Sequence, residues 1–122
     1  MGNRIVVRIR DENGKYSPDY YGHWCGLEAI FKLNGLVSNG TEFNGVENLF
    51  CNFIVAMMGG VQCPYNHYVY NHGEAEGMAD WDNYTWTYDM KTKQWTSTNP
   101  RFKNESLSFN EVIERLSDLG DE

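Results

Sequence analysis

Apolar and polar residues alternate near the start of the chain, and the period then lengthens to that of a helix. Between residues 5 and 9, isoleucine and valine alternate with arginine, which predicts a half-buried strand. An Asn-Gly pair at 13–14 predicts a tight turn, and residues 16–24 are predicted to return as a second strand. Apolar residues recur at helical spacing over residues 26–37 and again over residues 46–57. The first half of the chain is therefore predicted to hold two strands and then two helices.

The second half of the chain returns to a period of two. Residues 67–71 alternate, residues 72–82 form an acidic, loop-like segment, and residues 83–90 alternate between aromatic and polar positions. A turn then leads to a partner strand around Trp95. A Ser-x-x-Glu capping box at 108–111 opens a last amphipathic helix.

The predicted order of elements is ββ-αα-βββ-α. Strands joined by hairpins, with the helices grouped, indicate the α+β class: one mainly antiparallel sheet with helices packed on one face. The length of 122 residues fits one domain, and 41% hydrophobic and 15% aromatic residues are typical of a globular protein. We predict a single α+β domain over residues 1–122.

Charge and hydropathy narrow the possible partners and location. The chain has 10 basic and 17 acidic residues, a net charge of −7, which argues against binding the phosphates of nucleic acid or an anionic membrane. The longest apolar run, residues 53–58, is far short of the roughly 18–20 residues of a membrane helix. The alternating N-terminus does not resemble a signal peptide, and three cysteines without a C-x-x-C motif suggest reduced thiols. We predict a cytoplasmic protein with no nucleic-acid or membrane partner.

Three short segments resemble a known group of proteins. They are Gly2-Asn3-Arg4, the run from Tyr21 to Gly26 (YGHWCG), and the run from Asp82 to Trp86 (DNYTW). Similar segments occur in small uncharacterised phage and microbial proteins, which open on a G-N/D-R strand and carry a Y-x-H-W-x-G segment before a helix. The resemblance implies a phage or mobile-element origin and brings no known activity with it. It marks four positions for attention: Asn3, Arg4, His23 and Trp24.

Cys25 is the first candidate for chemistry. It lies where a predicted strand meets a predicted helix, and a helix N-terminus lowers the pKa of a thiol. His67 or His72 could act as the base and Asp82 could orient the imidazole, an order similar to that of papain-like cysteine hydrolases. A small cysteine hydrolase or transferase is therefore one alternative. A packed structural cysteine is the competing interpretation, since free cysteine is among the most buried residue types.

A structural zinc site is a second alternative. The pairs His23/Cys25 and Cys63/His67 have spacings that zinc ligands use. Ordinary burial of these side chains is the interpretation that we favour, so we predict no metal and no cofactor.

Two charged features have simple interpretations. Arg4, Arg8 and Arg10 are predicted to lie on the solvent-facing side of the first strand, where they pair with the excess carboxylates. The acidic segment at 73–82 does not match the spacing of a calcium-binding loop, and we interpret it as solvated.

Aromatic side chains are concentrated on the predicted strands. They either form the core under the helices or project from the other face as a surface that binds a protein. The candidate binding residues are His23, Trp24, Tyr84, Trp86, Tyr88 and Trp95. The chain has no motif for nucleotide binding, zinc proteolysis, serine hydrolysis or thiol redox chemistry. We favour a non-enzymatic interaction or accessory protein that acts through an aromatic-rich sheet surface or as a homo-oligomer, with a protein rather than a small molecule as partner.

Overall fold

The computed structural model describes residues 3–59 and 66–120, with side chains up to residue 116. In chain order the elements are β1 (Ile5–Arg10), β2 (Asp19–Gly22), α1 (Glu28–Val37), α2 (Gly45–Met58), β3 (His67–Tyr70), β4 (Thr85–Asp89), β5 (Gln94–Ser97), the 3₁₀ helix η2 (Pro100–Phe102) and α3 (Phe109–Gly120). The predicted α+β class and the order ββ-αα-βββ-α are confirmed. Within the described ranges, no helix combines the length and apolarity needed to cross a membrane.

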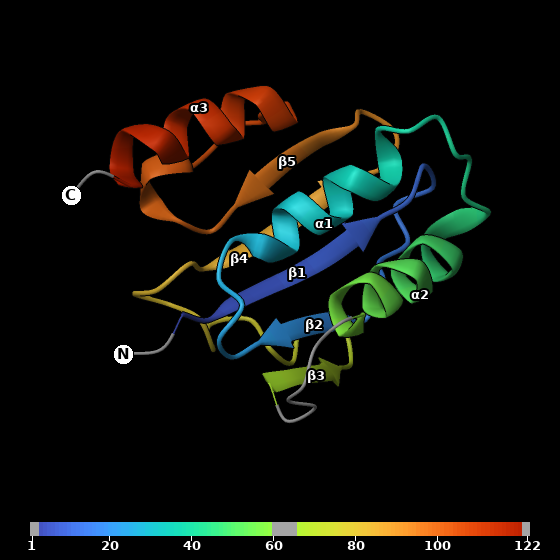
Figure 1. The fold of residues 1–122 in the computed structure, drawn as a ribbon, viewed down its shortest axis with the longest axis horizontal. Coiled ribbons are helices and arrows are strands. Elements are labelled where there is room, and N and C mark those ends of the chain that lie inside the picture. The colour runs from blue at the N-terminus through green and yellow to red at the C-terminus, as the bar shows by residue number, and fades with distance from the viewer. Residues whose placement is uncertain (1–2, 60–65, 121–122) are drawn as a thin grey trace.

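The five strands form one mostly antiparallel sheet in the order β3-β2-β1-β4-β5. The central pair, β1 and β4, is parallel, and the other neighbours are antiparallel. The two strands become neighbours although α1, α2 and β3 separate them in sequence, because β4 returns to the free side of β1 (Figure 1). Their carboxyl ends therefore lie at the same edge of the sheet.

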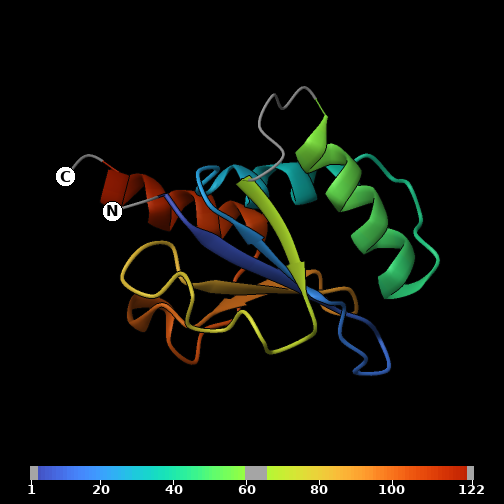
Figure 2. The ribbon, with the colours of Figure 1, turned by 90° about the horizontal axis from the view of Figure 1, so that it is seen from below.

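All three helices cover one face of the sheet, as predicted (Figure 2). Ile5, Val7 and Ile9 point toward them and are fully buried. The register places Tyr20 and Trp86 beside Val7, so these rings join the same core. The core is thus built from the alternation that the sequence displays on β1, extended sideways by strand pairing.

The opposite face is covered by the segment 71–84, which crosses it as a series of tight turns (Figure 2). Ala75 and Ala79 pack there against Val6 and Tyr21 in a second, smaller apolar cluster. This cover was not expected from the sequence, because the segment has the acidic composition of a solvated loop. It makes the sheet a layer buried on both faces.

The arginine stripe of β1 faces this second layer. Each arginine pairs with a carboxylate, as predicted: Arg4 with Asp82, Arg8 with Asp19 and Glu76, and Arg10 with Asp89. The prediction that the stripe faces solvent is wrong for Arg8, which is only 6% exposed because the segment 71–84 lies over it.

Two helix boundaries show how local chemistry acts. The capping box at the start of α3 is confirmed by reciprocal bonds, from the Glu111 N–H to Ser108 Oγ at 3.2 Å and from the Ser108 N–H to Glu111 Oε1 at 2.8 Å. In contrast, α1 begins at Glu28 and not at Gly26, because Gly26 has φ +55° and interrupts the helical backbone.

Candidate functional site

The three segments that carry the resemblance meet at one end of the sheet. The carbonyl of Asn3 accepts the N–H of Gly26 at 2.8 Å, and the Asn83 amide donates to Asn3 Oδ1 at 2.9 Å. The backbone N–H and Nε of Arg4 both donate to Asp82 Oδ2, at 2.9 and 3.2 Å. Asp82 therefore holds the start of β1 and does not orient an imidazole, so its predicted role in catalysis is not supported.

Cys25 lies beside a tyrosine that separates it from histidine. The Tyr20 hydroxyl is 2.6 Å from His67 Nδ1 and 3.4 Å from Cys25 Sγ. Gly22 leaves space for this arrangement, since a Cβ there would lie 2.2 Å from Sγ and 2.9 Å from the hydroxyl. The strand and the following turn thus place three polar groups in line, with the phenol in the middle.

Burial keeps all three groups in their uncharged forms. Burial raises the pKa of the Cys25 thiol, an effect that the hydrogen bond with Tyr20 opposes. Burial also raises the pKa of the Tyr20 phenol and lowers the pKa of the His67 imidazole. A neutral thiol beside a neutral phenol is a poor nucleophile, because the thiolate is the reactive species. The helix dipole gives no help, since α1 begins three residues after Cys25, and nearby Glu28 disfavours the thiolate further.

The second candidate base lies elsewhere. His67 pairs with Gly22 at one end of β2, whereas His72 lies beside Asp19 at the other, with its Nδ1 3.7 Å from Asp19 Oδ1 and its ring stacked on Tyr16. Among the residues that the structure describes, Cys25 has no hydrogen bond to a histidine. Within residues 3–59 and 66–120, Cys25 is therefore not paired with a base in the way that a cysteine hydrolase needs.

The structure gives no support to the zinc alternative. His23 Nδ1 is bonded to the Tyr21 hydroxyl at 2.9 Å, and Cys25 contacts Tyr20. Cys63 lies outside the described residues. In the described part of the chain, no three His, Cys, Asp or Glu side chains are grouped as metal ligands.

Three of the predicted binding aromatics belong to the core. Trp86, Tyr88 and Trp95 are 1%, 5% and 0% exposed, because strand pairing places them on the helix-covered face. They therefore cannot form an exposed platform, which corrects the prediction. Tyr84, half-buried with φ +65°, lies just before β4, and its amide is bonded to the carbonyl of Ala79.

The other two predicted aromatics belong to a different surface. His23 and Trp24 contact each other edge-on, with ring centroids 5.2 Å apart, and His23 continues to Tyr21. Tyr21 contacts Tyr68 and Tyr70, whose rings stack at 6.3 Å. We call this network the aromatic surface: Tyr21, His23, Trp24, Tyr68 and Tyr70. Trp24 is 57% exposed and Tyr68 40% exposed, so part of it faces solvent.

The aromatic surface continues onto an edge strand. β3 ends the sheet, and Val69 on its other face is also exposed. The N–H of His23 donates to the carbonyl of Asn66, which fixes the phase of the β2–β3 ladder. Because antiparallel peptide groups alternate in direction, those of His67 and Val69 point away from β2. The strand carries no proline and no Lys, Arg, Asp or Glu, the usual protections of an exposed edge.

Tyr20 and Tyr21 were missed as site residues from the sequence. Their adjacency in a strand means that they serve opposite faces, Tyr20 toward Cys25 and Tyr21 toward Tyr68, and this alternation was the available signal. Trp81, 88% exposed with φ +68°, was also missed because it lies in the acidic segment.

Comparisons of the chain with protein-family models, curated proteins and solved structures found no match.

Proposed function

We propose that this chain is a non-enzymatic interaction protein that binds through the edge of β3, and that its partner is a second copy of the chain. One observation carries the proposal: an uncharged edge strand, flanked by the exposed aromatic surface, leaves its outward peptide groups without a neighbouring strand among the described residues. Such an edge is a template for strand addition.

A second copy fits this edge by symmetry. A twofold axis through Val69, perpendicular to the sheet, would place Val69 opposite its symmetry mate as a hydrogen-bonded pair. The same axis would place Tyr68 opposite Tyr70 of the other copy. Residues directly opposite in an antiparallel pair share a face, and this register keeps tyrosine with tyrosine and valine with valine. His67 is the other residue of β3 whose peptide groups point away from β2, and it is not apolar. Val69 is therefore the position in β3 where an axis would pair two exposed apolar side chains.

The side chains favour the same pairing. On the aromatic surface, two Tyr68–Tyr70 pairs would extend the existing stack across the axis, each contributing about 0.2–1 kcal/mol relative to a pair of alanines. The net charge of −7 opposes association of two copies, but β3 itself has no carboxylate to repel its mate. Self-association therefore concentrates on this edge.

Analytical ultracentrifugation at several concentrations tests the proposal. We expect the wild-type chain to sediment as a dimer in equilibrium with monomer up to roughly 1 mM, where even a millimolar Kd populates the dimer. Val69→Lys should abolish the dimer, because it places two ammonium groups face to face on the axis. Val55→Lys is the matched control, since Val55 is 66% exposed on α2, and it should leave the dimer unchanged.

A second variant separates backbone pairing from side-chain contact. Val69→Pro removes the outward N–H, which β2 does not use, and should also give a monomer with a folded circular-dichroism spectrum. A wild-type chain that stays monomeric throughout, or a dimer that Val55→Lys disrupts and Val69→Lys does not, would contradict the proposal.

A further inference from the structure

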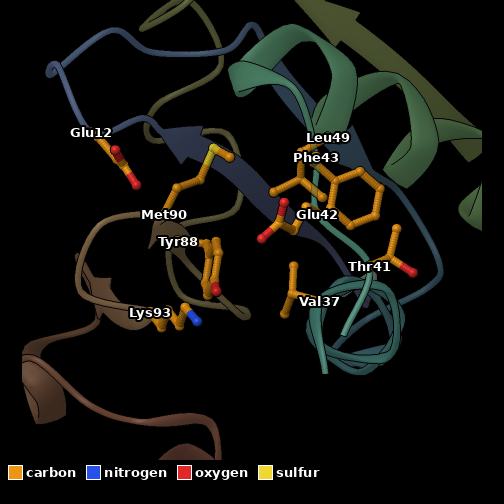
Figure 3. Close-up of a pocket in the computed structure, with 9 residues that line it drawn as sticks. All are labelled: Glu12, Val37, Thr41, Glu42, Phe43, Leu49, Tyr88, Met90 and Lys93. Atoms are coloured by element: carbon orange, nitrogen blue, oxygen red, sulfur yellow. The ribbon is translucent and has the colours of Figure 1, made fainter. Parts of the chain in front are cut away.

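A cavity of about 290 Å³ lies at the opposite end of the sheet from Cys25, beyond the carboxyl ends of the parallel strands β1 and β4 (Figure 3). Its apolar wall is formed by Val37 at the end of α1, Phe43 in the connection between the helices, and Leu49 of α2. The carboxyl ends of parallel strands are a common position for ligand sites, because the chain diverges there into separate loops. The cavity is distinct from the β3 edge and from the aromatic surface.

Tyr88 supplies the observation that points to a ligand. Its side chain is only 5% exposed, it lines the cavity, and its hydroxyl has no hydrogen-bond partner within the described part of the chain. The hydroxyl oxygen is not sealed off by protein atoms; it is reached from the cavity, where a ligand can complete its hydrogen bonding. Burial also raises the pKa of Tyr88, so the phenol keeps its proton and can donate it in a hydrogen bond. The hydroxyl is therefore a donor that lines the cavity and has no hydrogen-bond partner among the described residues.

Charges of both signs lie around this hydroxyl. Lys93, from the turn between β4 and β5, lies on the same side of the cavity as the Tyr88 hydroxyl in Figure 3. Glu42 and Glu12 line the cavity from the helix connection and from the turn after β1. None of these three charged groups forms an ion pair with another described residue. The cavity lining can thus meet both charges of a zwitterionic ligand.

We propose that this cavity binds a free apolar α-amino acid. The ligand carboxylate would accept from the Tyr88 hydroxyl and the Lys93 ammonium, and the ligand ammonium group would lie against Glu42. Its side chain would pack on Phe43 and Leu49. The volume lies near the lower end of the roughly 300–1,000 Å³ of ligand pockets, which suits an amino acid better than a nucleotide or a larger cofactor.

Isothermal titration calorimetry with three related probes tests the assignment of both charges. L-phenylalanine is expected to bind saturably, whereas 2-phenylethylamine lacks the carboxylate and 3-phenylpropanoate lacks the ammonium group. Each analogue should bind about tenfold more weakly or worse, because one charge-assisted interaction is lost. L-leucine and L-methionine are tested alongside, to find the side chain that fits best.

Two variants connect the binding to the named groups. Tyr88→Phe removes the hydroxyl and keeps the ring, so it should weaken binding of L-phenylalanine about tenfold or more while the unfolding temperature stays at the wild-type value or above. Lys93→Gln should weaken binding of L-phenylalanine and leave that of 2-phenylethylamine unchanged. Lys91→Gln is the matched control, since Lys91 is exposed in the same turn but does not line the cavity, and it should change neither affinity.

The proposal would be overturned by any of three results. The first is the absence of saturable binding of all three amino acids up to roughly 10 mM, a concentration at which even millimolar affinity is visible. The second is equal binding of L-phenylalanine and both analogues, which would indicate a purely apolar cleft. The third is unchanged affinity in Tyr88→Phe. None of these results bears on the oligomeric state, so they leave the test of the β3 edge independent.

Discussion

Arg8 and Asp19 form a two-pronged ion pair between neighbouring strands, beneath the segment 71–84. Arg8 Nε lies 2.9 Å from Asp19 Oδ1 and Nη2 lies 3.0 Å from Oδ2. Both side chains are almost fully buried, and Asp19 Oδ2 also accepts the backbone N–H groups of Gly73 and Ala75. The pair therefore joins β1 to β2 and fastens the segment that covers this face. Glu76, at 2.7 Å from Arg8 Nη1, completes the attachment.

Arg8→Gln should destabilise the fold strongly. It leaves the Asp19 carboxylate buried without its cation, and losing one partner of a buried pair costs about 3–5 kcal/mol. Arg10→Gln is the matched control. Arg10 lies on β1 like Arg8 and pairs with Asp89 of β4, but it is far more exposed, so its substitution should cost no more than about 1 kcal/mol. Urea unfolding of the two variants measures the difference. Equal losses in the free energy of unfolding would mean that the buried Arg8–Asp19 pair stabilises the fold no more than the exposed Arg10–Asp89 pair does.

The covering segment marks the limit of what the sequence could predict for the fold. Alternation and capping were sufficient for the strands, the helices and the helix-covered face, because each of these features is local. Alanines at 75 and 79 are too small to stand out in a hydropathy pattern, yet they seal the second face. The parallel pairing of β1 with β4 is equally invisible, since it joins residues about 80 positions apart.

The candidate site was predicted less well than the fold. Cys25 and His67 do lie near each other, but the sequence could not show that Tyr20 is between them or that burial keeps the thiol protonated. For Trp86 and Trp95, the alternation correctly predicted strands. It did not predict which face of the sheet the two rings would occupy, because a strand pattern does not say which side meets the helices. Strand register decides that question, and register depends on tertiary contacts.

Gly22→Ala tests the close packing around Cys25. The new Cβ would lie 2.2 Å from Cys25 Sγ, so the turn or the Tyr20–His67 bond must shift, at an expected cost of about 1–3 kcal/mol in the free energy of unfolding. Gly35→Ala is the control within α1, where nothing lies within 4 Å of the new Cβ, and it should stabilise by about 0.5–1 kcal/mol. Adding Cys25→Ala to Gly22→Ala should restore part of the loss. If it restores nothing, the thiol is not the obstacle.

Alkylation rates test the protonation state of Cys25. Burial raises its thiol pKa and limits access, whereas Cys51 is exposed on α2. Iodoacetamide at pH 7 should therefore modify Cys51 faster, by on the order of tenfold, as followed by peptide mass spectrometry. Tyr20→Phe removes the hydrogen bond that lowers the Cys25 pKa. In this variant Cys25 should therefore carry no more thiolate at pH 7 than it does in the wild type. Cys25 reacting first would revive the cysteine-hydrolase alternative.

The pH dependence of stability tests the state of His67. Burial lowers its folded-state pKa below the unfolded value of about 6.5, so the unfolded chain binds more protons as the pH falls past that value. The contribution of His67 to the free energy of unfolding is therefore fully present above about pH 6.5, where the imidazole is neutral in both states, and it declines at lower pH. Because the ring is partly exposed, this decline should stay under about 1 kcal/mol. His67→Gln keeps a hydrogen-bonding group near Tyr20 but cannot titrate. Urea unfolding at pH 7.5 and 5.5 should show a smaller loss for this variant than for the wild type, and because the carboxylates titrate in both chains, the difference isolates His67. A larger loss in His67→Gln would mean that the imidazole gains a proton on folding, with the opposite sign.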